Sequence, residues 1–183
     1  MASASPRRRE LISEILGIEA EIIPSSAEEN AVFTTPGGYV LALARLKAED
    51  IASKCDLPVV GADTVVYNGK VLGKPESSEA AAEMLRSLSG ITHEVYTGVC
   101  VAYKGKALCR YERTEVTMKH FTEEFIEQYI ASGSPMDKAG AYGLQDEMLA
   151  PFIAHVRGCR SNVIGLPVSL LTDMLKETDK WQR

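Results

Sequence analysis

The sequence predicts a single α/β domain over residues 1–183 that is built on a mixed β-sheet. Segments with helical spacing of apolar side chains alternate with apolar, β-branched runs. A long antiparallel pair of strands is indicated between His93 and Met118. The length of 183 residues suits one full domain and is too short for two comfortable ones. No internal repeat or linker interrupts the pattern.

The first helix, from Arg7 to Leu16, is predicted from apolar side chains that recur on one face, and Gly17 ends it. Pro6 suits the first helical position because its φ is already helical. Ser5, directly before it, is a residue type that favours the N-cap. We expect a short strand over Ala20–Ile23 after this helix.

The second helix opens at the pair Thr35-Pro36 and continues to about Ser53. The run from Leu57 to Tyr67 is apolar and β-branched, which is typical of a buried central strand. Asn68-Gly69 then predicts a hairpin turn that returns the chain through Val71 and Leu72.

The second half begins with an amphipathic helix over Ser77–Leu88, and two long strands follow, joined around Lys104-Gly105-Lys106. Thr122 caps a further predicted helix that continues to Ser132. The segment from Gly133 to Gln145 is rich in Gly, Pro and Asp and is interpreted as a loop. The last predicted elements are an apolar segment near Phe152–Val156 and a closing helix from Pro167 to about Glu177.

The composition excludes several classes of protein. A formal net charge of −5 makes general nucleic-acid binding a poor interpretation, so the basic residues would act locally, as a patch for a small anion. No run has the length of a membrane span or resembles a secretory leader. No C-x-x-C pair occurs, so reduced thiols in a cytosolic protein are expected rather than a zinc site or disulfides. The three histidines share no ligand spacing and are expected to be structural or surface residues.

The opening run, from Ala2 to Arg9, indicates phosphate binding. It combines two serine hydroxyls, the start of a helix and three arginines. Free N–H groups at a helix N-terminus attract anions, and guanidinium groups donate two hydrogen bonds to phosphate oxygens. The other interpretation of the run is a solvated basic helix.

Asp63 is the residue that most suggests chemistry, because it lies inside the most apolar strand of the chain. A carboxylate there costs several kcal/mol unless it is paired, hydrogen-bonded or bound to a metal. Gly61 and Ala62 are predicted to leave space for a ligand beside it. The alternative is a carboxylate at the end of a strand that caps a neighbouring loop; we favour the functional interpretation.

Other polar positions add to this pattern. Lys47 lies on the inner side of the second helix, and Lys74 follows the hairpin. Glu28-Glu29 lies in a polar loop, and the small residues of 137–145 permit close approach of the backbone to a ligand. Neither common phosphate-binding fingerprint, the P-loop or G-x-G-x-x-G, is present. A basic helix N-terminus, two lysines and an isolated acid suit a polyphosphate ester with a divalent metal.

Taken together, the segments resemble the Maf family of nucleoside triphosphate pyrophosphatases. The opening motif is similar over Ala2-Ser3-Ala4-Ser5-Pro6-Arg7-Arg8, and the strand motif over Gly61-Ala62-Asp63-Thr64-Val65-Val66. The similarity extends over essentially the whole chain in the right order, through residues 39–48, 69–75, 84–90, 93–99, 133–145 and 165–167.

The resemblance implies an elongated mixed sheet flanked by helices, with a deep nucleotide-binding cleft. It implies hydrolysis of a nucleoside triphosphate to the monophosphate and pyrophosphate with Mg²⁺, or with Mn²⁺ or Co²⁺ in its place. Residues 136–145 are similar to the branch that acts on dTTP and UTP, whereas the branch acting on 7-methyl-GTP has an acidic residue where Gln145 stands.

The chain departs from the family pattern at two places. The family has an apolar strand before its opening motif, whereas Met1 directly precedes Ala2 here, and we expect that strand in a longer native chain or in residues outside this numbering. The placement of Ser3 and Arg7 depends on it. Asp146-Glu147-Met148 stands where the family usually has glycines, so that loop is expected to lie differently.

We therefore expect a cytoplasmic dTTP/UTP pyrophosphatase. Asp63, Lys47 and Lys74 are assigned to catalysis. Asp63, together with Glu28, would hold the metal or deprotonate the attacking water. Ser3 and Arg7 would bind the triphosphate, Thr64 and Gln145 the base, and Arg8 both. We expect a nucleoside triphosphate as partner, with no nucleic acid or membrane, and leave a homodimer open. Alternatives are a pyrophosphatase for modified nucleotides such as 7-methyl-GTP, and a non-catalytic nucleotide-binding regulator of cell division.

Overall fold

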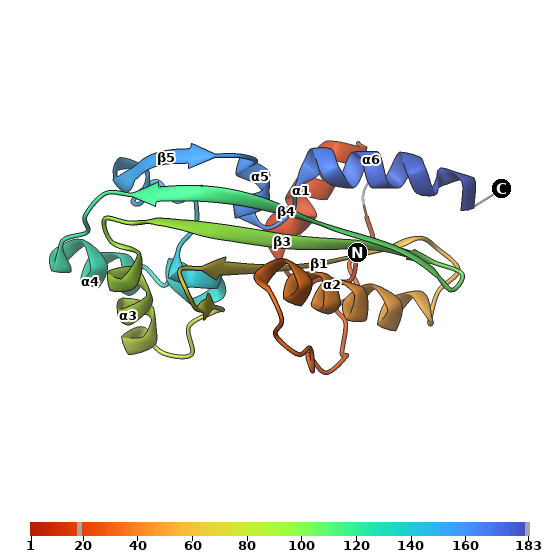
Figure 1. Cartoon of the computed structure of the whole chain (residues 1–183), viewed down its shortest axis with the longest axis horizontal. Coiled ribbons are helices and arrows are strands. Elements are labelled where there is room, and N and C mark those ends of the chain that lie inside the picture. Colours follow the sequence, from red (N-terminus) through yellow and green to blue (C-terminus); the bar gives the residue numbers. More distant parts are fainter. Residues whose placement is uncertain (18–19, 182–183) are drawn as a thin grey trace. The chain divides into compact units, whose positions relative to one another are not determined.

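The computed structural model describes residues 1–17 and 20–181. Helices alternate with strands along the chain (Figure 1), which confirms the α/β class. The helices are α1 (Pro6–Leu16), α2 (Pro36–Ala52), α3 (Ser78–Leu88), α4 (Glu123–Ala131), α5 (Arg160–Ile164) and α6 (Val168–Thr178). The strands are β1 (Val59–Tyr67), β2 (Val71–Leu72), β3 (Thr92–Tyr103), β4 (Lys106–Met118) and β5 (Ile153–Arg157).

The five strands form one sheet with the order β2-β1-β3-β4-β5. β1 pairs with β2 in antiparallel register, with Val66 opposite Leu72, and β4 pairs with β5 in the same sense. A parallel contact is made by the isolated bridge between Ala2 and Gly61. The sheet is therefore antiparallel in these two ladders, and the bridge at Ala2 adds a parallel contact of the kind expected in a mixed sheet.

Residue contacts divide the chain into two compact units. Unit 1 comprises residues 1–63, 97–112 and 165–183, and unit 2 comprises residues 64–96 and 113–164. Each of the three long strands contributes residues to both units. The organisation of residues 1–183 as one domain stays a prediction.

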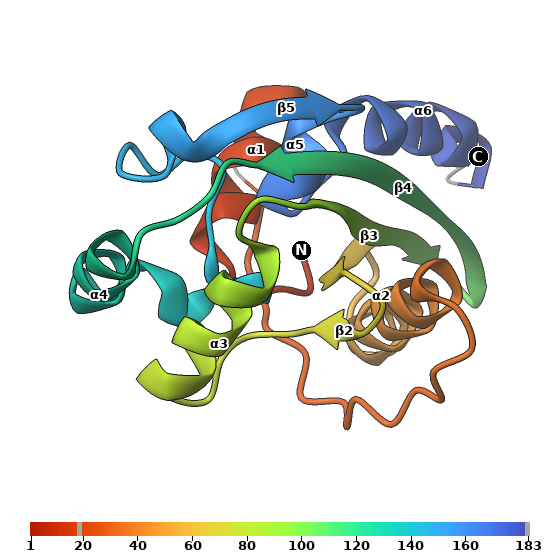
Figure 2. The ribbon, with the colours of Figure 1, turned by 60° about the vertical axis from the view of Figure 1, so that its left-hand side comes forward.

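In unit 1, helices cover both faces of the strands. Figures 1 and 2 show α2 on one side of the strands and α1 with α6 on the other. Because side chains alternate along a strand, Val60 and Ala62 join the core under α1 and α6, while Gly61 and Asp63 belong to the α2 side. That core also buries Ile12, Leu171 and Met174.

The contact between α2 and the strands is very close. A Cβ built on Gly61 would lie 2.3 Å from the carbonyl oxygen of Ala44, and one on Gly98 would lie 2.3 Å from that of Val40. Both glycines therefore make room for the backbone of α2. The expectation that Gly61 leaves space for a ligand was wrong, because the helix occupies that space.

In unit 2, α3 and α4 pack side by side over a core that also takes residues from the strands (Figure 2). Leu85 and Leu88 of α3 and Ile126 and Tyr129 of α4 are almost completely buried there. Thr122 caps α4 as predicted, accepting a hydrogen bond from Phe125 N. Ser77, expected as the first residue of the helix, instead caps α3 and accepts a hydrogen bond from Ala80 N.

Three local expectations were wrong. Ala20–Ile23 forms no strand; Met1 bonds this segment, because its ammonium group donates to Glu21 O and its carbonyl accepts from Ile23 N. The segment Gly133–Gln145 is not a plain loop, since it contains 3₁₀ turns at Ser134–Asp137 and Ala139–Ala141. The short helix α5 was not expected, and five residues are too few for a periodic signal.

The cysteines required a further correction. Cys100 in β3 and Cys109 in β4 form a disulfide, with Cα atoms 4.1 Å apart, whereas reduced thiols were expected. The cause is the turn Lys104-Gly105, where both residues have positive φ, as a two-residue hairpin loop of type I′ requires. Residues equally distant from such a turn face each other across the two strands. Cys55 and Cys159 are free thiols.

Within residues 1–17 and 20–181, no helix has both the length and the apolar character needed to cross a bilayer.

Candidate functional residues

The first group of candidate residues is a cluster of three charged side chains in unit 1. The Lys47 ammonium group lies 2.6 Å from Asp63 Oδ1 and 2.8 Å from Glu29 Oε1. The side chains of Lys47 and Asp63 are only 16% and 13% exposed, so water screens this pair weakly. The cluster joins α2, β1 and the loop that precedes α2.

Local structure explains why Lys47 meets Asp63. The Thr35 side chain caps α2 by accepting from Gly38 N, and the helix buries Val40, Leu43 and Ala44. Lys47 follows Ala44 by three residues, so it lies on the same face of the helix one turn later. Asp63 shares its face of β1 with Gly61, where the helix backbone makes its close approach. The buried carboxylate is therefore paired with a buried ammonium rather than capping a loop end.

A second group in unit 1 lies at the N-terminus of α1. Arg8 donates from Nε to Gly165 O at 2.8 Å and from Nη1 to Ser3 Oγ at 3.2 Å. Burial is the main cause that lowers the pKa of Arg8, and the negative charges of Asp63 and Glu29 act against it. Arg8 therefore lies within electrostatic range of the Lys47 cluster and remains a cation.

The start of α1 differs from the expected cap. Ser5 occupies the N-cap position but its side chain makes no capping hydrogen bond, and Ser3 Oγ instead accepts from Ser5 N at 3.2 Å. The hydroxyl of the buried Ser3 thus contacts both the helix start and Arg8. Arg7 lies one residue earlier and is half-buried. The roles of Ser3, Arg7 and Arg8 in binding substrate stay predictions.

The two acids of the loop before α2 differ in what they contact. The carboxylate of Glu28 accepts from Asn30 Nδ2 at 2.7 Å on the surface, whereas Glu29 reaches Lys47. Glu28 as a metal ligand stays a prediction, and Glu29 is the residue that sequence reasoning did not select. The adjacent pair Glu28-Glu29 was visible in the sequence as a possible source of an acid for the site. A loop has no periodicity, however, so the sequence does not show which of the two side chains turns inward.

The described carboxylates near Asp63 are too few to hold a divalent ion without help from the substrate. Among residues 1–17 and 20–181, no three His, Cys, Asp or Glu side chains are grouped so as to hold a metal ion by themselves. Mg²⁺, however, is usually bound through one or two carboxylates together with substrate phosphates and water. Asp63 and Glu29, which converge on one cationic side chain, fit that smaller requirement.

A separate group of candidate residues belongs to unit 2 and contains Thr64, Lys74 and Gln145. The N–H of Gly140 donates to Gly73 O at 2.9 Å, which brings the Lys74 segment next to the segment that ends at Gln145. Lys74 and Gln145 have exposed side chains, and Thr64 is half-buried. The predicted roles of these three residues, and the deep cleft that the resemblance implies, stay predictions.

A group of buried and half-buried polar residues next to Gln145 was also not selected from the sequence. Tyr129, Ser134, Lys138 and Asp146 form a connected network in unit 2. The unusual Asp146 was noticed only as a departure from the glycines of the family pattern. Its partners are distant in sequence, so no local signal could reveal them. As expected, the histidines are structural or on the surface: His93 is buried against Tyr142, and His120 and His155 are exposed.

Comparison with known proteins adds evidence independent of this geometry. The sequence model described as "Maf-like protein" matches residues 1–178. A dTTP/UTP pyrophosphatase from Bacillus thuringiensis subsp. konkukian is 47% identical over 180 residues, covering 97% of this chain and 93% of that protein. A protein of the same name from Bacillus cereus is 48% identical with the same coverage.

A solved structure also resembles the chain. The Staphylococcus aureus Ham1 protein superposes with a TM-score of 0.56 and covers 97% of each chain, at 14% sequence identity. At that identity the likeness supports the fold alone.

Proposed function

Because the chain belongs to the Maf-like protein family, we propose that it hydrolyses dTTP and UTP to the monophosphate and pyrophosphate. The single structural observation that carries the proposal is the Asp63–Lys47–Glu29 cluster, in which the acid singled out from the sequence is mostly buried and paired. The activity itself is supported by relatives of the same name at 47–48% identity over nearly the whole chain.

In the proposed reaction a water molecule attacks the α-phosphorus and the α–β anhydride bond breaks. Asp63 would accept the proton of that water, or would hold the metal; both assignments use the same carboxylate. Lys47 balances the charge of Asp63 and would present an ammonium group to the phosphates. Lys74 would add a second cation as charge builds on the leaving pyrophosphate.

The group at the start of α1 would bind phosphate oxygens. Arg8 and Ser3 are already connected by a hydrogen bond, so the guanidinium is held at one orientation before substrate arrives. Arg7 supplies a further guanidinium from the adjacent position. Arg8, Thr64 and Gln145 would contact the base. A neutral Gln145 amide both donates and accepts, which matches the N3–H donor and O4 acceptor of uracil and thymine.

We propose Mg²⁺ as the cofactor, with Mn²⁺ or Co²⁺ as substitutes, and Asp63 with Glu29 as the carboxylates that would hold it. When bound, such an ion supplies positive charge that stabilises the phosphate oxygens in the transition state. We also propose a cytoplasmic location, where nucleotides are available, and no partner beyond the nucleotide except a second copy of the chain.

Release of pyrophosphate from dTTP, UTP, CTP, GTP and 7-methyl-GTP tests the proposal, with and without a chelator. We expect the highest kcat/KM for dTTP and UTP, and loss of activity on chelation that returns with added Mg²⁺. A preference for 7-methyl-GTP would assign the chain to the other branch of the family. Nucleotide binding without turnover of any of the five would favour a regulator that does not need catalysis.

A further inference from the structure

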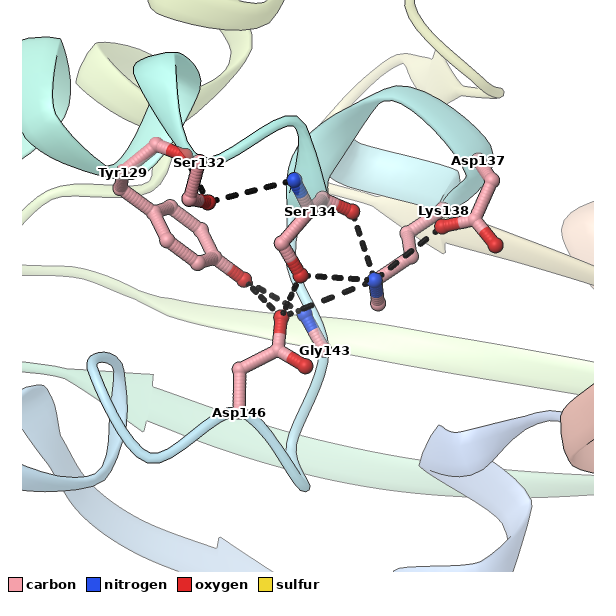
Figure 3. Close-up of polar contacts among 7 residues, drawn as sticks. All are labelled: Tyr129, Ser132, Ser134, Asp137, Lys138, Gly143 and Asp146. Carbon is pink, nitrogen blue, oxygen red and sulfur yellow. Dashed lines mark hydrogen bonds and ion pairs between the residues drawn. The ribbon is translucent and has the colours of Figure 1, made fainter.

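Asp146, the residue directly after Gln145, is at the centre of a polar network in unit 2 (Figure 3). Its Oδ2 accepts hydrogen bonds from the Tyr129 hydroxyl and, at 2.7 Å, from Ser134 Oγ. The Lys138 ammonium group lies 3.7 Å from the same oxygen. Two hydrogen-bond donors and one ammonium group, from two different segments, thus converge on one carboxylate.

Two of these three partners of Asp146 are buried. Tyr129 is fully buried, and its ring packs in the core between α3 and α4. Burial, followed by the hydrogen bond to Asp146, raises the pKa of Tyr129, so its hydroxyl stays protonated and remains a donor. Lys138 is 8% exposed, and its ammonium also donates to Ser134 O at 2.6 Å and to Asp137 Oδ1 at 3.1 Å.

The same network holds the backbone on both sides of Gln145. Gly143 N donates to the Tyr129 hydroxyl at 3.1 Å, and Asp146 N donates to Gly143 O at 3.0 Å. Residues 143–146 therefore form one turn, and Tyr129 bonds both its first and its last residue. A Cβ on Gly143 would lie 2.6 Å from Lys138 Cε, so even the space at the start of this turn is defined by the network.

Gln145 is the exposed residue of this fixed turn. Its neighbours Leu144 and Gly143 are buried, and Asp146 is half-buried, whereas the side chain of Gln145 is open to solvent. A side chain that must recognise a base by hydrogen bonds gains from a backbone that is already in place, because less freedom is lost on binding.

We propose that Asp146 and Tyr129 are positioning residues that orient Gln145 for base recognition. The inference rests on the proposed function, in which Gln145 contacts the pyrimidine. Neither residue is assigned to the chemical step.

The test compares kcat/KM for dTTP with kcat/KM for CTP in Asp146→Asn and Tyr129→Phe. We expect the dTTP/CTP ratio to fall about tenfold in each, the equivalent of losing one ordinary discriminating contact. KM for dTTP should rise more than kcat falls, since the change affects base binding rather than chemistry. Both substrates are measured on the same preparation, so a loss of folded protein cancels in the ratio.

Three further variants complete the design. Glu147→Gln removes an exposed charge from the next position and should keep the parent ratio. The single variant Gln145→Ala should lose the preference for dTTP over CTP. In the double variant Gln145→Ala/Asp146→Asn the ratio should equal that of Gln145→Ala, because a positioning residue has nothing left to position.

Two failures are distinguishable. If Gln145→Ala keeps the parent ratio, Gln145 does not read the base, and that part of the proposed function is wrong together with this inference. If Gln145→Ala loses the preference while Asp146→Asn and Tyr129→Phe keep it, base reading stands and the positioning role is wrong. An additive loss of the dTTP/CTP ratio in the double variant would also contradict the positioning role. It would show that Asp146 affects the ratio independently of Gln145.

Discussion

The carboxylate of Asp63 has a salt-bridge partner at 2.6 Å, and this pairing distinguishes it from an ordinary buried acid. Removing one member of a buried ion pair usually costs stability, because the other charge is left without compensation. A substitution of Asp63 that removes the charge but keeps the shape of the side chain therefore separates its chemical role from its structural role.

Asp63→Asn should lower kcat for dTTP at least ~100-fold, the typical contribution of an acid–base group. The amide can still accept a hydrogen bond from Lys47, so the folded state should persist, which circular dichroism can check. Asp56→Asn, at an exposed position seven residues earlier, is the matched control and should retain parent activity. Near-normal turnover in Asp63→Asn would contradict the catalytic assignment.

The adjacent acids of the loop before α2 allow a matched pair of variants. Glu29→Gln should lower kcat/KM about tenfold, roughly 1.4 kcal/mol of transition-state stabilisation, because it removes a carboxylate from the Lys47 cluster. Glu28→Gln should change kcat/KM less than about twofold, since its carboxylate contacts Asn30 on the surface. Steady-state kinetics with dTTP decides between them; the reverse order would return the role to Glu28.

The contrast between Asp63 and Glu29 shows what sequence reasoning reaches at this scale. A carboxylate inside an apolar strand is visible because its burial is costly without a partner. Lys47 was also identifiable, because it interrupts the apolar side of a periodic helix. The choice between two adjacent acids in an irregular loop depends on tertiary contact, which no local pattern encodes.

At the level of elements, the helices were well predicted because their signals are local. The caps Thr35, Ser77 and Thr122 stand one residue before the observed helix starts. The predicted strand at Ala20–Ile23 failed because a strand exists only with a partner, and this segment bonds to Met1 instead. The disulfide was missed because Cys100 and Cys109 were judged by their separation along the chain, not by their equal distance from the turn.

The close packing of α2 on β1 gives a prediction for stability. Gly61→Ala should lower the free energy of unfolding by about 1–3 kcal/mol, because the added methyl group overlaps the backbone of the helix at Ala44. Gly73→Ala is the control: a Cβ there meets no atom within 4 Å, and the change should stay within about 0.5 kcal/mol. Denaturant unfolding measures both. Equal stability of the two variants would show that the helix can move away from the strand.

At the level of the whole molecule, the candidate residues fall into two groups that the sequence presents as one list. Ser3, Arg8, Lys47 and Asp63 belong to unit 1, and Thr64, Lys74 and Gln145 belong to unit 2. The boundary passes through β1 between Asp63 and Thr64. The class of fold and the order of elements were accessible from periodicity, whereas this division depends on long-range contacts and was not.

The stability of the whole molecule should depend on pH through His93. Its burial lowers the pKa to about 4, and Nε2 lies 2.8 Å from the Tyr142 hydroxyl. In the unfolded chain the pKa is about 6.5, so the unfolded state takes up a proton first as the pH falls. The stability that neutral, buried His93 contributes is therefore fully present above about pH 6.5 and is lost on acidification to about pH 4. The free energy of unfolding should fall by about 3 kcal/mol over that range.

Urea unfolding between about pH 7.5 and about pH 4 measures this contribution. His93→Gln, which does not titrate, should show a shallower decrease of stability with acidification than the parent. His120→Gln removes an exposed histidine and should keep the parent slope. If the slopes of the parent and His93→Gln coincide, His93 is not the group responsible.

The two-residue turn between β3 and β4 has a consequence for insertions and deletions. Side chains alternate between the two faces of a strand, so one residue added at Lys104-Gly105 and absorbed by sliding β4 would exchange its faces. Cys109 would then turn away from Cys100, and the buried Val116 and Met118 would turn toward solvent. The length of this hairpin loop is thus constrained by residues more than ten positions away, and a library of loop lengths here should yield folded protein mainly at two residues.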